Sequence, residues 1–206
     1  MAEDLLSDDK ARSVLKRILA MYPDAKGELQ WDNTFHLLCA VMMSAQTTDK
    51  MVNRVMPDFI KKFPTPEILA NVPIEEIENT IKTIGLYRSK AKHLKATAQI
   101  LVEKYNSEIP EDKKILMTLP GVGEKTANVV LAEGYGVPAI AVDTHVSRIS
   151  KVFHIVDQKA TPHEVEQRLE SILPKNEWIK THHAMILFGR YTMPARAKGD
   201  PYSYLN

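Results

Sequence analysis

Residues 119–128 of this 206-residue chain read Leu-Pro-Gly-Val-Gly-Glu-Lys-Thr-Ala-Asn. Glycines at 121 and 123 permit backbone torsions and close approaches that a β-carbon obstructs. Apolar, helix-forming residues flank the segment, which predicts two helices joined by a tight turn. A turn that runs into a helix N-terminus offers unpaired N–H groups and a positive dipole end to a phosphate. The segment therefore indicates either a purely structural corner or a hairpin that binds phosphate.

Two better-known nucleotide-binding motifs do not fit these residues. A P-loop requires glycine immediately before the lysine, where Glu124 stands. A dinucleotide fingerprint requires a third glycine at the position of Thr126 and a preceding strand. Both motifs are therefore excluded.

Hydrophobic periodicity outside this segment is helical. Val14, Leu15 and Ile18 form one apolar face that Pro23 ends, and residues 35–45 are apolar on nearly all sides, as in a buried central helix. Further helices are expected from 49 to 60 with a kink or break at Pro57, after Thr65-Pro66, after Val72-Pro73 up to Gly85, from Ser89 to 105, after Asp143, after Thr161, and from 176 to 188. No alternating strand pattern of any length is found, so the sequence predicts an all-α fold.

The single cysteine, Cys39, limits the classes of site that the chain can build. A disulfide framework, a structural zinc and an iron–sulfur cluster all need several thiols. The paired His182 and His183 point about 100° apart on a helix, so they and His145 are expected to pack or hydrogen-bond rather than hold a metal. We expect no metal and no cofactor. The single cysteine favours a reducing cytoplasmic location. No membrane partner is expected, because no apolar run approaches roughly 18 residues.

Charge is unevenly distributed although the net charge is only +1. Residues 1–9 carry Glu3, Asp4, Asp8 and Asp9 without a base. Residues 82–104 carry six bases against Glu103, namely Lys82, Arg88, Lys90, Lys92, Lys95 and Lys104. The basic run is either a solvated helix face, which is the preferred interpretation of the run alone, or a docking surface for a polyanion.

An acidic residue follows the glycine segment in Val142-Asp143-Thr144-His145. An isolated aspartate here would be explained by helix N-capping. If the glycine turn begins one helix and Asp143 caps the next, Lys125 and Asp143 can face one cleft. Such a pair supplies an amine nucleophile and a fixed carboxylate.

With these residues the chain resembles the helix-hairpin-helix DNA glycosylases, and within them the endonuclease III family. The resemblance extends from about residue 12 to Tyr191. It is carried by Ser44-Ala45-Gln46-Thr47-Thr48-Asp49, Thr83-Ile84-Gly85-Leu86-Tyr87 with Ser89-Lys90-Ala91, residues 119–130, residues 142–145, and His182-His183 with Gly189-Arg190-Tyr191. It implies a cleft between a helical domain at 27–135 and a second domain made of 1–26 and 136–206.

The resemblance also implies a reaction and a partner. A monomeric enzyme would flip a damaged base, an oxidised pyrimidine, out of duplex DNA. Lys125 would attack the sugar and form a Schiff base, Asp143 would stabilise the developing charge, and β-elimination would nick the strand. Gln46 would fill the vacated stack and Leu86 would wedge the opposite strand. The remaining DNA-contacting residues would be Gly121, Val122, Gly123, Thr126, Arg148 and Arg190.

The chain departs from the family after Tyr191. The family usually carries a four-cysteine iron–sulfur loop there, whereas Met193 stands where the first ligand is expected. We therefore expect a variant without the cluster, in which Arg190, Arg196 and Lys198 supply a reduced DNA contact. Three alternatives remain: an enzyme that mainly cleaves abasic sites, a mismatch or uracil glycosylase, and a non-catalytic helix-hairpin-helix module that binds DNA.

Overall fold

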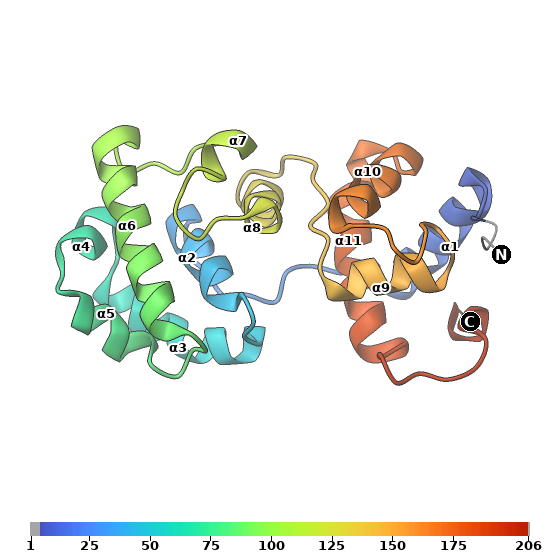
Figure 1. The fold of residues 1–206 in the computed structure, drawn as a ribbon, viewed down its shortest axis with the longest axis horizontal. Coiled ribbons are helices and arrows are strands. Elements are labelled where there is room, and N and C mark those ends of the chain that lie inside the picture. The colour runs from blue at the N-terminus through green and yellow to red at the C-terminus, as the bar shows by residue number, and fades with distance from the viewer. Residues whose placement is uncertain (1–4, 206) are drawn as a thin grey trace. The chain divides into compact units, whose positions relative to one another are not determined.

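The computed structural model describes residues 5–205, and all regular structure in that range is helical (Figure 1). The predicted all-α fold is confirmed. Glu3 and Asp4 of the acidic N-terminal run lie outside the described residues. Over the described part of the chain, the model contains no helix with the length and apolar character needed to cross a membrane.

The chain forms two compact units. The middle unit runs from Glu28 to Val137, and the terminal unit combines the N-terminal segment up to Gly27 with the segment from Pro138 onward. The middle unit contains α2 (Thr34–Ser44), α3 (Asp49–Lys62), α4 (Pro66–Asn71), α5 (Ile74–Ile81), α6 (Tyr87–Tyr105), α7 (Lys113–Leu116), α8 (Glu124–Val129) and the π-helical turn η1 (Val130–Gly134). The terminal unit contains α1 (Asp8–Met21), α9 (Thr144–Val152), α10 (Pro162–Ile172), η2 (Lys175–Glu177), α11 (Trp178–Leu187), the π-helical turn η3 (Phe188–Thr192) and η4 (Pro201–Leu205).

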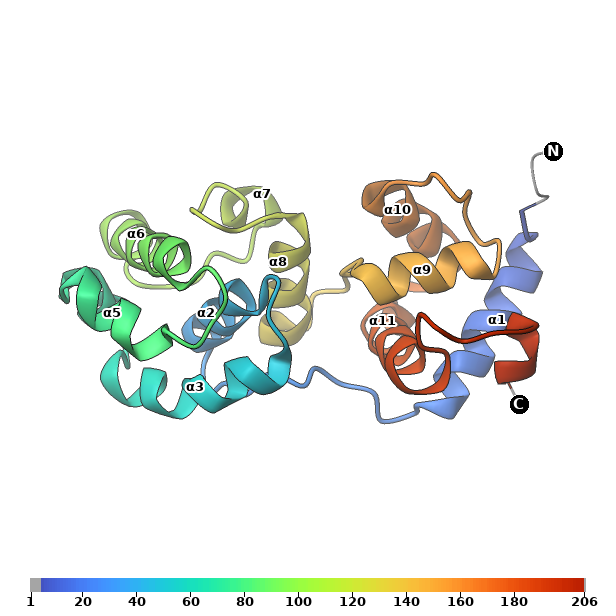
Figure 2. The ribbon, with the colours of Figure 1, turned by 60° about the horizontal axis from the view of Figure 1, so that its bottom comes forward.

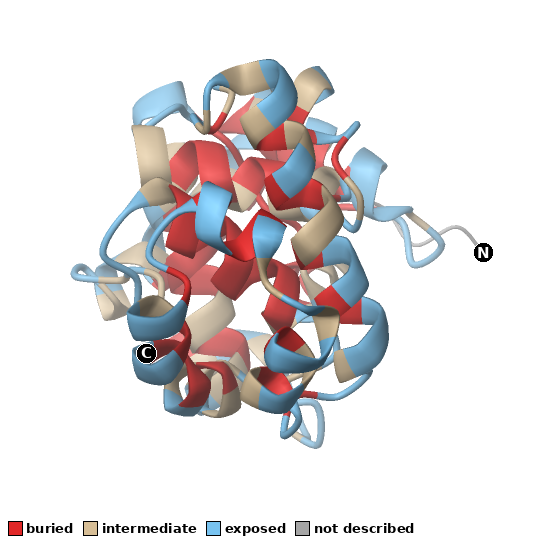
Figure 3. Cartoon of the chain, turned by 90° about the vertical axis from the view of Figure 1, so that its left-hand side faces the viewer, coloured by how far each residue is buried: buried red, intermediate tan, exposed pale blue. Residues whose placement is uncertain are grey.

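Helix α2 forms the centre of the middle unit, where it contacts α3, α6 and α8 (Figure 2). Its residues 35–43 are all buried, as its uniformly apolar sequence predicts. The buried faces of the surrounding helices complete one apolar core, and exposed residues lie on their outer faces (Figure 3). This core fixes the loops that carry the candidate site residues of this unit.

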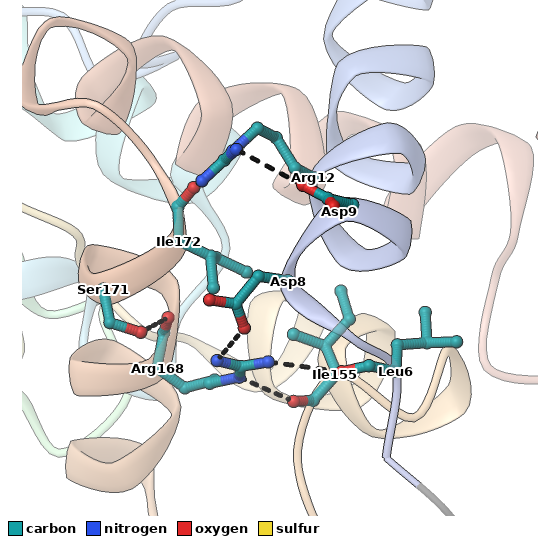
Figure 4. Close-up of polar contacts among 8 residues, drawn as sticks. All are labelled: Leu6, Asp8, Asp9, Arg12, Ile155, Arg168, Ser171 and Ile172. Carbon is teal, nitrogen blue, oxygen red and sulfur yellow. Dashed lines mark hydrogen bonds and ion pairs between the residues drawn. The ribbon is translucent and has the colours of Figure 1, made fainter.

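The terminal unit joins the two ends of the chain through a second core. The apolar face of Val14, Leu15 and Ile18 belongs to the same core as the buried residues of α9, α10 and α11, and α1 lies beside α11. Two arginines add polar links (Figure 4). Arg168 of α10 pairs with Asp8 at 2.7 Å and donates to the carbonyl of Leu6 at 3.2 Å, while Arg12 donates to the carbonyl of Ile172 at 2.8 Å. The N-terminal helix is thus held by the C-terminal half of the chain.

Local capping signals locate several helix starts correctly. Thr161 accepts from the backbone N–H of Glu164, whose carboxylate accepts from the Thr161 N–H, so both halves of the capping box are present. The Thr65 side chain accepts from the N–H of Ile68 at the start of α4, and Asp143 caps α9. These starts depend on residues within one turn of each other.

Three expected boundaries are wrong. Helix α3 continues through Pro57, so the expected break is wrong and only the expected kink stays a prediction. Pro57 lies on the exposed face, where water can reach the carbonyl that proline leaves without an N–H partner. Helix α5 ends at Ile81 rather than Gly85, because the chain turns with a bond from the Ile84 N–H to the Ile81 carbonyl. Helix α6 starts before Ser89, and its N-cap is Leu86.

Candidate active site

The glycine segment forms the predicted hairpin between α7 and α8. The N–H of Val122 donates to the Leu119 carbonyl at 3.1 Å, and the N–H of Ala127 donates to the Gly123 carbonyl at 3.0 Å. The Thr97 hydroxyl of α6 donates to the Pro120 carbonyl at 3.0 Å. Val122 is buried, whereas Gly121 and Gly123 are exposed, so the hairpin presents backbone at its tip and anchors itself through one apolar side chain.

Gly121 is required by its surroundings. Its φ is +78°, in the region that favours glycine, and an added β-carbon would lie 2.9 Å from the Nδ1 atom of His93 on α6. Any other residue would therefore be strained and would also push the imidazole away. The geometry of the turn itself thus requires glycine at this position, as the structural interpretation of the segment predicts.

Lys125 is the second residue of α8, directly after the hairpin, and its side chain is exposed. Its neighbour Glu124 pairs with Lys113 of α7 at 3.0 Å across the hairpin. Thr126 is half-buried on the following position. The lysine is thus accessible at the end of a turn whose two helices are held together.

Asp143 lies in the terminal unit as the N-cap of α9. Its Oδ1 atom accepts from the backbone N–H groups of His145 and Val146, both at 2.8 Å. These two bonds fix the carboxylate and do not use Oδ2. The capping interpretation of this residue is therefore correct, and it is compatible with a second use of the same carboxylate. The expectation that Lys125 and Asp143 face one cleft stays a prediction.

Gln46 and Leu86 are both exposed, on two neighbouring loops of the middle unit. Leu86 is 65% exposed, so it is not part of the apolar core. Gln46 lies two residues beyond the end of α2, whose C-cap is Ala45, so Gln46 does not cap that helix. Both residues have a positive φ, 55° at Gln46 and 58° at Leu86.

The basic run at 82–104 is not a uniform solvated face. Lys90 is 7% exposed, and its ammonium donates to the carbonyls of Met43 and Ala45, each at 2.7 Å, and to the hydroxyl of Thr47 at 3.0 Å. Burial lowers the pKa of Lys90. The sequence reasoning missed this residue, although it lies inside the quoted Ser89-Lys90-Ala91 motif and one helical turn after Leu86.

Arg148 and Arg190 lie in the terminal unit. The Arg148 guanidinium donates to the carbonyls of Gly189 at 2.9 Å and Met193 at 2.7 Å, and burial lowers its pKa, against the raising effect of Asp143. This arginine ties α9 to η3 and the residues after it, a use that the sequence analysis did not foresee. Arg190 is half-buried within η3. A DNA contact by either side chain stays a prediction.

The histidines expected to pack lie in the core of the terminal unit. The ring centroids of His182 and His183 lie 4.0 Å apart with the ring planes tilted by 41°, and both residues are buried. Burial lowers the pKa of His183 to about 4. His145 contributes its backbone to the Asp143 cap and lies against Gly189, where an added β-carbon would be 2.9 Å from the His145 Cβ.

Comparison with known proteins gives a consistent result. The family model described as "HhH-GPD superfamily base excision DNA repair protein" matches residues 39–175. Endonuclease III of Bacillus subtilis (strain 168) is 48% identical over 183 residues, which cover 89% of this chain and 84% of that protein. A structure of a trapped endonuclease III–DNA covalent intermediate is 48% identical with a TM-score of 0.91, covering 94% of this chain and 91% of the other.

A non-covalent endonuclease III–DNA complex is 46% identical with a TM-score of 0.93 over 98% of this chain and 95% of the other. The matches extend across both units and include the hairpin, the Gln46 and Leu86 loops and the α9 cap. The chain therefore belongs to the HhH-GPD superfamily of base excision DNA repair proteins, in its endonuclease III family.

Proposed function

We propose that this chain is a bifunctional base-excision repair enzyme that removes oxidised pyrimidines from duplex DNA and then cleaves the strand at the resulting abasic site. The observation that carries the proposal is an exposed lysine, Lys125, directly after the glycine hairpin. A relative 48% identical over nearly the whole chain has been trapped as a covalent intermediate with DNA. An amine nucleophile is the group that such a covalent step requires.

The chemistry assigned to Lys125 begins with attack of its Nζ atom on C1′ of the deoxyribose. The glycosidic bond breaks and its electron pair leaves with the damaged base. Opening of the sugar ring and loss of a proton give an imine between Nζ and C1′. Removal of a C2′ proton then expels the 3′ phosphate by β-elimination, which nicks the strand. The Asp143 carboxylate, held by two backbone N–H groups, stabilises positive charge on the sugar during base departure.

Access to the sugar requires that the base leave the stack, at a cost of a few kcal/mol. We assign Leu86 as the wedge and Gln46 as the side chain that fills the vacated space, because both are exposed and their loops adjoin. The hairpin residues Gly121, Val122, Gly123 and Thr126 are assigned to the DNA backbone, with Val122 acting as the buried anchor.

We also propose that the two units are the functional domains, with boundaries near 27 and 135, and that the protein acts in the cytoplasm without an iron–sulfur cluster. The only cysteine, Cys39, is buried within α2 of the middle unit. In the terminal unit, other contacts hold the segment after η3. Arg148 binds the Met193 carbonyl, Arg17 donates to the Leu205 carbonyl at 2.8 Å, and Tyr202 stacks edge-on against Phe153. These non-covalent contacts hold the segment after η3 against α1 and α9 of the same unit.

Borohydride trapping on abasic duplex DNA tests the proposal directly. Wild-type protein should become covalently attached, and Lys125→Ala should not. Lys114→Ala is the matched control, because Lys114 is an exposed lysine on the other helix of the hairpin. Equal trapping by wild type and Lys125→Ala would show that another amine is the nucleophile.

Duplexes containing thymine glycol, dihydrouracil, uracil or an abasic site separate the alternatives. Base release from the first two with nicked products supports the proposal. Nicking of the abasic duplex alone identifies an abasic-site lyase, excision of uracil identifies a mismatch or uracil glycosylase, and binding without either product identifies a non-catalytic module. Asp143→Asn should preserve the α9 cap, since asparagine caps as well as aspartate, while base release slows by orders of magnitude.

A further inference from the structure

Gln46 and Leu86 are held in a backbone conformation that their side chains disfavour. A left-handed conformation costs a residue with a β-carbon about 1–2 kcal/mol, and here two exposed residues adopt it in two separate loops. Such strain persists only when the surroundings fix the backbone. The contacts that fix these two loops are therefore expected to lie nearby in the middle unit.

The ammonium of Lys90 contacts the first of these loops, the turn at 43–47 that carries Gln46. Its three N–H donors have three acceptors, the carbonyls of Met43 and Ala45 and the hydroxyl of Thr47, at 2.7–3.0 Å. These acceptors surround Gln46 in sequence. All three acceptors are neutral oxygens, and the bonds are charge-assisted because the donor is an ammonium, on a residue that is 7% exposed.

The backbone of Lys90 is connected to the second loop. Its N–H donates to the Leu86 carbonyl at 3.0 Å, the first hydrogen bond of α6. The two loops also adjoin directly, because a β-carbon added to Gly85 would lie 3.7 Å from the Gln46 carbonyl oxygen and 3.6 Å from the Thr47 hydroxyl. One residue thus joins the turn that carries Gln46 to the turn that carries Leu86.

We propose that Lys90 is a positioning residue for base extrusion, which locks the Gln46 turn against the Leu86 turn so that both side chains enter the DNA stack together. The inference rests on the proposed function and extends it to a residue that contacts neither the base nor the sugar. Without the ammonium, three acceptors lose their donors, and the turn at 43–47 is free to relax toward a negative φ at Gln46. The filler would then separate from the wedge.

The test compares Lys90→Met with wild type on two substrates. The first is a duplex containing thymine glycol, which requires base extrusion, and the second is a single-stranded oligonucleotide with an abasic site, which does not. Lys90→Met should slow single-turnover excision from the duplex about tenfold or more, as expected for loss of charge-assisted hydrogen bonds, and should cleave the single strand at the wild-type rate. A 2-aminopurine beside the lesion should show slower or weaker unstacking in stopped-flow fluorescence.

Lys95→Met is the matched control. Lys95 is on the same helix, is half-buried and also donates to a backbone carbonyl, that of Val72, which is remote in sequence from both loops. The same loss of charge and donors there should leave the ratio of the two rates unchanged. A general loss of stability would reduce both rates in either variant, and thermal melting of each variant measures that loss separately.

A multiple-mutant comparison tests whether Lys90 acts through Gln46 and Leu86. In a Gln46→Ala, Leu86→Ala background, Lys90→Met should change the duplex rate by less than about twofold, because residues acting as one unit are not additive. Equal slowing on both substrates, or a full additional tenfold loss in that background, would overturn the inference. If wild type fails to act on either substrate, the proposed function itself is wrong, and the two failures are therefore distinguishable.

Discussion

At Leu86 the strained backbone should make glycine more stabilising than alanine, the opposite of the order at an ordinary helix position. Leu86 has φ 58° and ψ 31° at the N-cap of α6 and exposes 65% of its surface. Replacing it by alanine removes an exposed side chain but keeps the β-carbon strain. Replacing it by glycine removes the strain, about 1–2 kcal/mol, and adds the unfolded-state entropy of glycine, about 0.5–1 kcal/mol. Leu86→Gly should therefore be more stable than Leu86→Ala by roughly 0.5–1 kcal/mol.

Urea unfolding of the two variants measures this difference. The control pair is Lys92→Gly and Lys92→Ala, at an exposed position inside the same helix. There glycine should be the less stable variant by about 1 kcal/mol, so the sign reverses between two sites six residues apart. If the glycine variant is less stable than the alanine variant at Leu86 as well, the left-handed conformation does not store strain in solution.

The same two variants should both lose excision of thymine glycol from duplex DNA, since neither carries a wedge. A glycine variant that is more stable yet less active would mean that the leucine is retained for its use on DNA at the expense of folding free energy. Full duplex activity of Leu86→Gly would refute the wedge assignment without affecting the stability argument.

Three further predictions concern titration and metal. Burial, followed by the charge of Asp49, raises the pKa of Glu133 to about 7, against the lowering effect of a hydrogen bond from Trp31. The contribution of Glu133 to stability is therefore lost as pH rises from about 4.5 to 7. In urea unfolding, Glu133→Gln should be about 1–3 kcal/mol more stable than wild type at pH 8 and equal to it near pH 4.5. Burial lowers the pKa of His183 to about 4, so stability should fall as pH drops from about 6.5 to 4, and His183→Gln, measured the same way, should lack this component. Chelator should leave the melting temperature and abasic-site cleavage unchanged, and the preparation should be colourless; a stoichiometric iron–sulfur absorbance would contradict the proposed variant.

Structural features that depend on residues close together in the sequence were predictable. The cap at Asp143, the capping box at Thr161 and the buried helix at 35–43 all depend on near neighbours or on one helix's own pattern. The start of α6 was not predictable in this way, because its N-cap is a left-handed leucine and the adjoining Gly85 lies near a loop about forty residues earlier. Local signals favoured Ser89 instead.

The structural contacts of two cationic side chains were hidden from the sequence for the same physical reason. Lys90 and Arg148 carry formal charges that composition assigns to the surface, yet each binds backbone carbonyls more than forty positions away. Sequence separation of this size hides the partner, so a charge that completes a hydrogen-bonding site looks like one that faces solvent. Lys125 is the opposite case, since its motif is local and its side chain is exposed.

The two ends of the chain share one core, and this has a consequence for synthesis. Helix α1 leaves the ribosome before the middle unit, but its buried face packs on α10 and α11, which are made only after the whole middle unit. Because domains fold as units while the chain emerges, the middle unit can close around α2 while Val14, Leu15 and Ile18 still face water. During that interval the nascent chain exposes an apolar helix face, which only the last part of the terminal unit covers.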